Sequence, residues 1–418
     1  MHKTHSWRLI SLLAVSIVLM GVVTPSTWAD APNLKKKRVV IGGLFSLTGS
    51  WATLGRASQA ALSIAIADAN AYLADRNASF RLEGRVEDTQ LVPALALEKA
   101  QLFARQEVRL LLGPQSSAEV AALRAFVDAN DLFLFSPSST AGTLAIADDR
   151  IFRFTPSDGP EGEAISALMD EDGIKAIVPL WRDDPGNNGL QDATRRSFTA
   201  LGGVVLPGVR YSATATDFST AVADIAAQVA TARVQHGANA VAVYLVAFDE
   251  AVAIFARASQ NETLAAVRWY GSDGTALSAA LLNDPIAAAF AESVGYPNPL
   301  FGLEAAATTK WQPIAQRIQQ QTGNVPESFA LGVYDAVWVI AKTLATQRGK
   351  VRVETLTRAF PQEAASFFGT TGWTVLNAAG DRQFGNFDFW AIREEGGVLR
   401  WKPVAHYNTA SGDLRREE

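Results

Sequence analysis

The chain has 418 residues, enough for two or three domains at about 150 residues each. Apolar residues make up 48% of it and charged residues 19%, which is typical of a soluble globular protein and excludes a disordered one. The formal net charge of −5 without a long basic run argues against a nucleic-acid partner, and the absence of cysteine excludes disulfides, thiol nucleophiles and cysteine-ligated metals.

Residues 1–29 have the pattern of a secretory signal peptide. Lys3 and Arg8 precede an apolar run over residues 9–23, and small residues at Thr27 and Ala29 favour cleavage after about Ala29. An uncleaved membrane anchor is the alternative, but the run is shorter than the roughly 20 residues that cross a bilayer. Because the chain has no cysteine to carry a lipid, we expect a free protein in the periplasm.

Strands and helices alternate along the chain in two series. In the first, strands are expected at 39–45, 81–87, 109–112 and 132–135, with helices at 52–73, 93–107 and 118–129. In the second, helices are expected at 159–170, 190–201, 218–234 and 249–260, with strands at 175–181, 204–209, 240–246 and 267–270. Helices at 308–322 and 328–346 and strands at 372–376, 387–392 and 399–406 complete the chain. Strands separated by helices predict an α/β protein with two doubly wound lobes and parallel central sheets.

Three hydroxyl-rich turns follow strands of the first series, at residues 46–55, 113–119 and 136–142. Because ligands bind beyond the carboxyl ends of parallel strands, Ser117, Ser138 and Thr140 are candidates for binding a small carboxylate. Helix capping is the competing interpretation, and Ser116 with Glu119 fits a capping box.

Acidic residues occupy the corresponding loops of the second series. Asp273, in Gly271-Ser272-Asp273-Gly274, could hold an ammonium group, and the alternative is an Asx turn or a helix cap. A calcium loop counted from Asp184 would place Arg195 where a bidentate glutamate belongs, so we expect no metal there.

Four segments resemble one family: residues 43–49 (GLFSLTG), 113–117 (GPQSS), 135–140 (FSPSST) and 329–336 (FALGVYDA). They are similar to the branched-chain amino acid type of periplasmic solute-binding protein, the receptor component of ABC importers. The resemblance covers about residues 38–405. It implies a type I periplasmic binding protein fold, in which two lobes are joined by a three-strand hinge. The implied divisions are residues 38–156 with 297–385 for lobe 1, 157–296 with 386–407 for lobe 2, and a tail over 408–418.

The resemblance also implies a ligand site. The family's carboxylate-binding serine falls on Ser117, and the contacts of its second turn fall on Ser138 and Thr140. The ammonium-binding acid falls on Asp273, and a pocket-edge aromatic residue falls on Phe329.

Three positions depart from the family pattern. Leu54 stands where the family has an aromatic residue, although Trp51 lies nearby and is a further candidate for ligand contact. Gly186 and Ala247 stand where the family has tyrosines, and the loss of two rings is expected to enlarge or reshape the side-chain pocket.

These features predict a binding protein, without cofactor, that captures an aliphatic, branched-chain or related amino acid by hinge closure. Its partners would be this ligand and an inner-membrane ABC permease, and we expect a monomer. After residue 29 the chain has only His236 and His406 and none of the hydrolase or nucleotide-binding motifs, so an enzyme is not expected. The alternatives are an amide, a urea-like compound or an aromatic carboxylate as ligand, or a sensory role for the same fold.

Overall fold

A five-stranded parallel sheet forms the centre of the first lobe. The computed structural model describes residues 36–417, so the predicted signal peptide over residues 1–29 lies outside the described residues. The strand order is β2 (Phe80–Asp88), β1 (Lys37–Phe45), β3 (Leu110–Leu112), β4 (Phe133–Ser136) and β5 (Ile151–Arg153).

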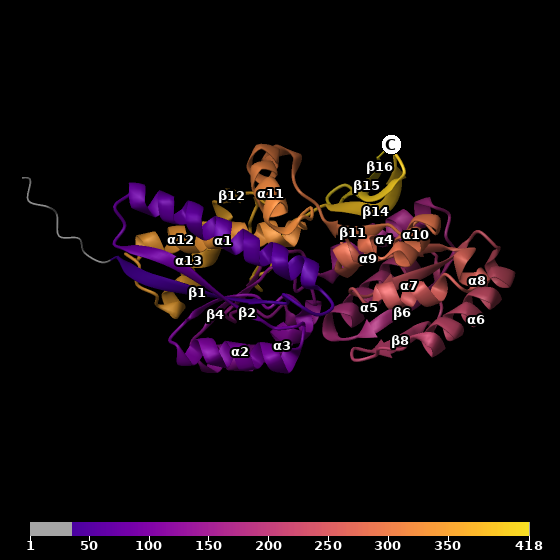
Figure 1. The fold of residues 1–418 in the computed structure, drawn as a ribbon, viewed down its shortest axis with the longest axis horizontal. Helices are drawn as coiled ribbons and strands as arrows, with labels where there is room; N and C mark the ends of the chain where they lie inside the picture. The colour runs from indigo at the N-terminus through magenta and orange to yellow at the C-terminus, as the bar shows by residue number, and fades with distance from the viewer. Residues whose placement is uncertain (1–35, 418) are drawn as a thin grey trace, which may run out of the picture. The chain divides into compact units, whose positions relative to one another are not determined.

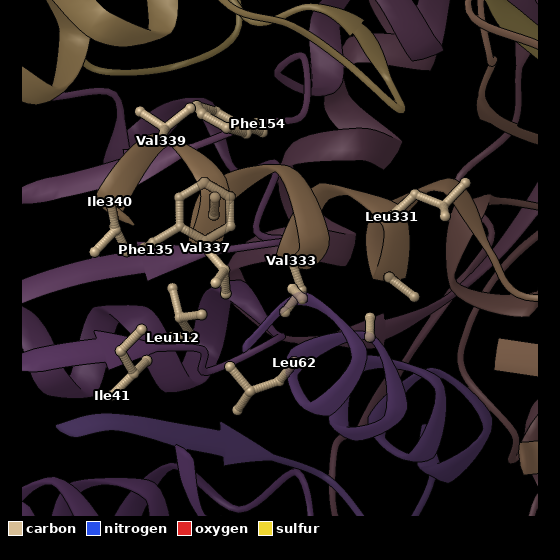
Figure 2. Packing of buried hydrophobic residues seen from close by; sticks show 14 of the residues in the cluster. Ile41, Leu62, Leu112, Phe135, Phe154, Leu331, Val333, Val337, Val339 and Ile340 are labelled. Carbon is tan, nitrogen blue, oxygen red and sulfur yellow. The ribbon is translucent and has the colours of Figure 1, made fainter. Parts of the chain in front are cut away.

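Helices cover both faces of this sheet (Figure 1). They are α1 (Ala52–Asp75), α11 (Thr308–Thr322), α12 (Ser328–Thr346) and α13 (Val353–Ala365) on one face, and α2 (Pro93–Arg105) and α3 (Ser117–Ala129) on the other. Side chains alternate between the faces along each strand. Leu110 and Leu112 therefore pack in the apolar cluster on the face of α1 and α12, the first cluster, and Leu111 packs in a second cluster on the face of α2 and α3. Figure 2 shows the first cluster, in which Ile41 and Leu112 of the sheet lie near Val337 and Ile340 of α12.

A second parallel sheet forms the centre of the second lobe. Its order is β10 (Arg268–Tyr270), β9 (Val241–Val246), β6 (Ala176–Asp183) and β7 (Val204–Val205), with β8 (Val209–Ser212) also paired to β6. Val243 and Leu245 pack toward one face, and Tyr244 and Val246 toward the other. The first face is covered by α6 (Ser219–His236), α7 (Ala251–Ala258), α8 (Glu262–Ala265) and α10 (Pro285–Ser293), and the second by α4 (Asp158–Glu171) and α5 (Pro185–Ala200).

The chain passes between the two lobes three times. It leaves the first sheet after β5, returns after β11 (Asn298–Phe301), and crosses again before β14 (Phe387–Glu395). A four-stranded antiparallel sheet lies at these crossings, in the order β11, β14, β15 (Val398–Asn408) and β16 (Asp413–Arg416). Two parallel-sheet lobes joined in this way confirm the predicted fold class, whereas the exact lobe boundaries stay a prediction.

Most predicted elements are present, with three differences. The strand expected at 204–209 is divided into β7 and β8, because Gly208 has φ +67° and its α-carbon lies too close to the Pro179 carbonyl for any side chain. The strand expected at 372–376 is reduced to a short hairpin of β12 (Phe368–Gly369) and β13 (Gly372–Trp373), whose turn is held by hydrogen bonds to Asp335. The segment expected to be a C-terminal tail contains β16.

Several short elements carried no strong sequence pattern. They are β5, β11, the helix α9 (Ala279–Asn283) and the 3-10 helices η1 (Gly142–Leu144), η2 (Asp273–Thr275) and η3 (Ala305–Ala307). Helices α8, α10 and α13 were also not predicted. Among the described residues, α12 is long and apolar enough to cross a membrane, but most of it is buried in the core of the first lobe.

Candidate functional site

The carboxyl ends of both parallel sheets face one small cavity. Segments after β1, β3 and β4 form its first wall, and segments after β6, β9 and β10 form the opposite wall. The cavity measures about 20 Å³ and is lined by Trp51, Ser116, Ser117, Ser138, Thr140, Asp184, Gly186, Asn187, Leu190, Phe248 and Asp273. It therefore lies where ligands bind in sheets of this kind.

The capping box predicted at Ser116 and Glu119 is present at the start of α3. The Ser116 hydroxyl accepts a hydrogen bond from the Glu119 amide at 3.3 Å and donates one to Glu119 Oε2 at 2.7 Å. Because this hydroxyl proton is used within the cap, Ser116 is left as an acceptor toward the cavity.

Ser117 connects two loops of the first wall. Its Oγ accepts a hydrogen bond from the Ala141 amide at 3.2 Å and lies 3.0 Å from Ser139 Oγ. When Ser139 supplies the proton of that pair, the Ser117 hydroxyl remains free to donate into the cavity.

Ser138 and Thr140 contribute main-chain donors to the same wall. The Ser138 hydroxyl donates to the Gln115 carbonyl at 3.0 Å, which holds the loop after β4 against the loop after β3. Among residues 36–417, the amides of Ser138 and Thr140 have no hydrogen-bond acceptor. Free amides beside a hydroxyl suit an anionic group such as a carboxylate.

A buried arginine fixes the loop that carries these donors. Arg153 is 1% exposed and donates through Nη1 to the carbonyls of Ser139 and Ala141 at 3.1 and 2.9 Å. Its Nε and Nη2 bind the Asp381 carboxylate at 2.5 and 2.8 Å. The loop is thereby attached to the segment that precedes the third crossing.

A pair of buried carboxyls belongs to the opposite side, and of the two only Asp273 lines the cavity. Asp273 is 7% exposed, and its amide donates to Glu161 Oε1 at 3.1 Å. Burial and the charge of Asp158 raise the pKa of Asp273 to about 7. Burial and the charge of Asp273 raise the pKa of Glu161 well above its usual range. A cation in the cavity would favour the charged form of Asp273.

Asp184 also lines this wall, but its oxygens are occupied. It caps α5 by accepting from the amide and the Nδ2 of Asn187 at 3.0 and 2.8 Å, and it accepts from Arg182 Nε at 3.0 Å. Arg182 also lies 3.3 Å from Glu250. The Asp184 carboxylate thus serves the cap of α5 and the ion pair with Arg182, and no cluster of three or more acids or histidines that could hold a metal ion is found among the described residues.

Three aromatic rings close one side of the cavity. The centroid of the Trp51 ring lies 4.6 Å from that of the Phe248 ring. It lies 6.2 Å from the centroid of the Phe329 ring, in an edge-to-face arrangement. Trp51 and Phe248 line the cavity, whereas Phe329 contacts it only through Trp51.

The space expected from two missing tyrosines is not open. A β-carbon at Gly186 would lie 3.2 Å from Ser117 Oγ, so the start of α5 approaches the first wall closely. Ala247 is fully buried, and its neighbour Phe248 packs on Trp51. These two positions therefore leave little open space beside the cavity.

The structure thus brings five predicted residues, Trp51, Ser117, Ser138, Thr140 and Asp273, to one cavity, with Phe329 behind it. No sequence pattern marked Asn187, Leu190 or Glu161 as part of the site. Glu161 lies 112 residues before Asp273, so only the packing of α4 reveals their contact.

The two described histidines lie away from this cavity. His406 contacts Asp388 at 2.6 Å between β15 and β14, and His236 ends α6.

Comparisons with known proteins identify sequences that are similar to this chain. The profile of the family described as periplasmic binding protein matches residues 38–384. An uncharacterized protein of Methanocaldococcus jannaschii is 28% identical over 422 residues, which cover 97% of this chain and 98% of the relative.

Solved structures of solute-binding proteins share the fold. The branched-chain amino acid transporter substrate-binding protein LivJ from Streptococcus pneumoniae, in complex with isoleucine, is 20% identical, with a TM-score of 0.70 over 88% of this chain and 99% of LivJ. An ABC transporter solute-binding protein from R. palustris, in complex with benzoate, is 18% identical, with a TM-score of 0.68 over 91% of this chain and 98% of that protein.

Proposed function

The chain belongs to the periplasmic binding protein family, and from this premise we propose that it captures an amino acid between its lobes and delivers it to the permease of an ABC importer. The family and fold are those of solute-binding proteins, which are not enzymes. Membership implies a small-molecule ligand, a transporter permease as partner, and a location outside the cytoplasm.

One observation carries the choice of an amino acid. The Ser117 hydroxyl and the free amides of Ser138 and Thr140 lie on one wall, and the Asp273 carboxyl lies on the other. A molecule with a carboxylate at one end and an ammonium at the other matches both walls at once.

The buried acids favour an amino acid over an aromatic carboxylate. The solved relatives bind isoleucine in one case and benzoate in another. Benzoate has no cation to offer Asp273 and Glu161, so it would leave both buried carboxyls uncompensated. An ammonium group would compensate them.

Capture follows from the division of the site between two lobes. In an open form a ligand contacts only one wall at a time. A ligand that contacts both walls therefore binds the closed form more tightly. We therefore propose that the ligand favours closure and that the closed form is presented to the permease. The predicted signal peptide over residues 1–29 supports a periplasmic location.

A ligand panel tests the proposal. Residues 30–418 would be expressed alone and heated with L-amino acids, with the matching carboxylic acids that lack the amine, and with amides and urea. Because binding to the native state raises the melting temperature, we expect shifts with amino acids only. Shifts with the plain acids alone would contradict the amino acid assignment and leave a solute-binding protein for carboxylates.

A further inference from the structure

A buried carboxyl precedes the helix that carries Phe329, one of the three aromatic residues described above. Glu327 directly precedes α12 and is 1% exposed, and neither of its carboxyl oxygens has a hydrogen-bond partner among residues 36–417. It occupies the cap position of α12 but makes no cap hydrogen bond with its side chain. Since buried polar groups are costly unless they are paired, helix capping does not account for it.

The charged groups that act on Glu327 are themselves carboxylates. Burial, followed by the charges of Asp249 and Asp273, raises the pKa of Glu327 well above its usual range. Asp249 follows Phe248 in the second lobe and accepts a hydrogen bond from Ser278 Oγ at 2.5 Å. Acids of the second lobe therefore act electrostatically on Glu327, which precedes α12 of the first lobe.

Two of the three rings described above are close to these acids along the chain. Phe329 is two residues beyond Glu327, Phe248 is next to Asp249, and Trp51 packs between the two rings. Trp51 is 3% exposed and its Nε1 has no hydrogen-bond partner in the described part of the chain. The indole is thus held by packing, and moving it breaks no hydrogen bond of Nε1.

Aromatic faces together with carboxylates are the surroundings that a desolvated organic cation prefers. An aliphatic side chain would meet the rings but would leave Glu327 without a partner. A cationic or donor-bearing group would satisfy both the rings and the carboxyl.

We propose that the ligand carries a second cation, an ammonium, amidinium or guanidinium group at the end of its side chain, and that Glu327 receives this cation when the Trp51 indole moves aside. The cavity of about 20 Å³ does not include Glu327, so the movement of Trp51 provides the additional length. This inference rests on the proposed function, because the α-ammonium of the same ligand is assigned to Asp273.

Isothermal titration calorimetry with matched ligand pairs tests the inference. L-lysine is compared with L-norleucine and L-arginine with L-citrulline, and the diamine cadaverine is added as a ligand without a carboxylate. The protein is residues 30–418, as wild type, as Glu327→Gln, and as the control Glu354→Gln, whose side chain on α13 is 80% exposed. Glutamine keeps the size of Glu327 and removes its charge.

The expected result is that wild type and Glu354→Gln bind the cationic member of each pair at least about tenfold more tightly, and that Glu327→Gln loses this preference. Equal binding of both members of each pair, with no selective effect of Glu327→Gln, overturns the inference and leaves the proposed function intact. Binding of cadaverine alone, weakened by Glu327→Gln, supports the cation site but overturns amino acid capture. No binding by any member of the panel overturns both.

Discussion

In the proposed site, the Asp273 carboxyl is the partner of the ligand's ammonium group. We expect Asp273→Asn to weaken the binding of the amino acid found in the panel by about 10- to 100-fold, because a hydrogen bond to a charged group is lost. Titration calorimetry measures the effect, and Asp192→Asn, an exposed change on α5, is the control. If the corresponding amine-free acid lost affinity to the same degree, Asp273 would not be the ammonium ligand.

The raised pKa of Asp273 predicts how affinity depends on pH. Asp273 faces Glu161, Asp158 and Asp184, and its pKa is raised to about 7 in the unliganded protein. An ammonium binds the charged carboxylate, so affinity should increase as the pH rises through about 7. Calorimetry in buffers of different ionisation enthalpy should also detect protons released on binding. An affinity that is constant from pH 5.5 to 8.5 would contradict this account.

The same pKa has the opposite effect on the stability of the unliganded protein. Because the folded state binds the proton more tightly than the unfolded state, Asp273 contributes stability that is fully present below its usual pKa of 3.8 and is lost as the pH rises to about 7. Asp273→Asn should therefore lose less stability than wild type over this range in urea titrations.

At the scale of elements, two hydrogen bonds join the start of α1 to the second lobe. The Asp249 amide donates to the Ser50 carbonyl at 2.8 Å, and the Ala279 amide at the start of α9 donates to Thr53 Oγ1 at 3.1 Å. Both donors belong to the second lobe, so these bonds exist only when the lobes are together.

Thr53→Val should weaken closure without harming the fold. In the closed form the buried Ala279 amide would lose its acceptor, at a cost of about 1 to 3 kcal/mol, whereas water would satisfy it in the open form. Ligand affinity should therefore fall by about 5- to 100-fold while the melting temperature without ligand stays unchanged. The control is Thr231→Val on the exposed face of α6, and equal affinity of both variants would count against this view of closure.

Longer elements were predictable because their apolar residues repeat with a clear period. The strands of the first sheet and helices α1 to α3 have such patterns, and Ser116 with Glu119 correctly marked the start of α3. β5 has three residues and β11 four, which are too few to show a period. Asp284 before Pro285 was a usable signal for α10, since aspartate caps and proline begins helices.

The site was predictable only where residues adjoin strand ends. Ser117, Ser138 and Thr140 follow strands of the first sheet and Asp273 follows a strand of the second, so the parallel topology places each at the carboxyl edge of its own sheet. Glu161 and Glu327 belong to helix starts far along the chain, and their burial depends on how the lobes pack. No local pattern contains that information.

At the scale of the whole molecule, the buried pair of Arg153 and Asp381 links segments on either side of the second lobe. Asp381→Asn would leave Arg153 buried without a compensating charge, and we expect a loss of about 3 to 5 kcal/mol in the free energy of unfolding. The exposed pair of Arg358 and Glu354 is the matched control, for which Glu354→Gln should cost less than about 0.5 kcal/mol. Chemical denaturation measures both variants, and similar small losses would contradict the role of Arg153.

The order of elements along the chain has a consequence for folding during synthesis. The face of the first sheet shown in Figure 2 is covered by α12, which the ribosome makes more than 170 residues after β5 is complete. The segment of the second lobe from α4 to β11 is synthesised in between, but its clusters are completed only by β14 and β15, which follow α12. The part of this apolar face that α12 covers therefore stays exposed until α12 is synthesised, and such a nascent chain is a natural client for a chaperone.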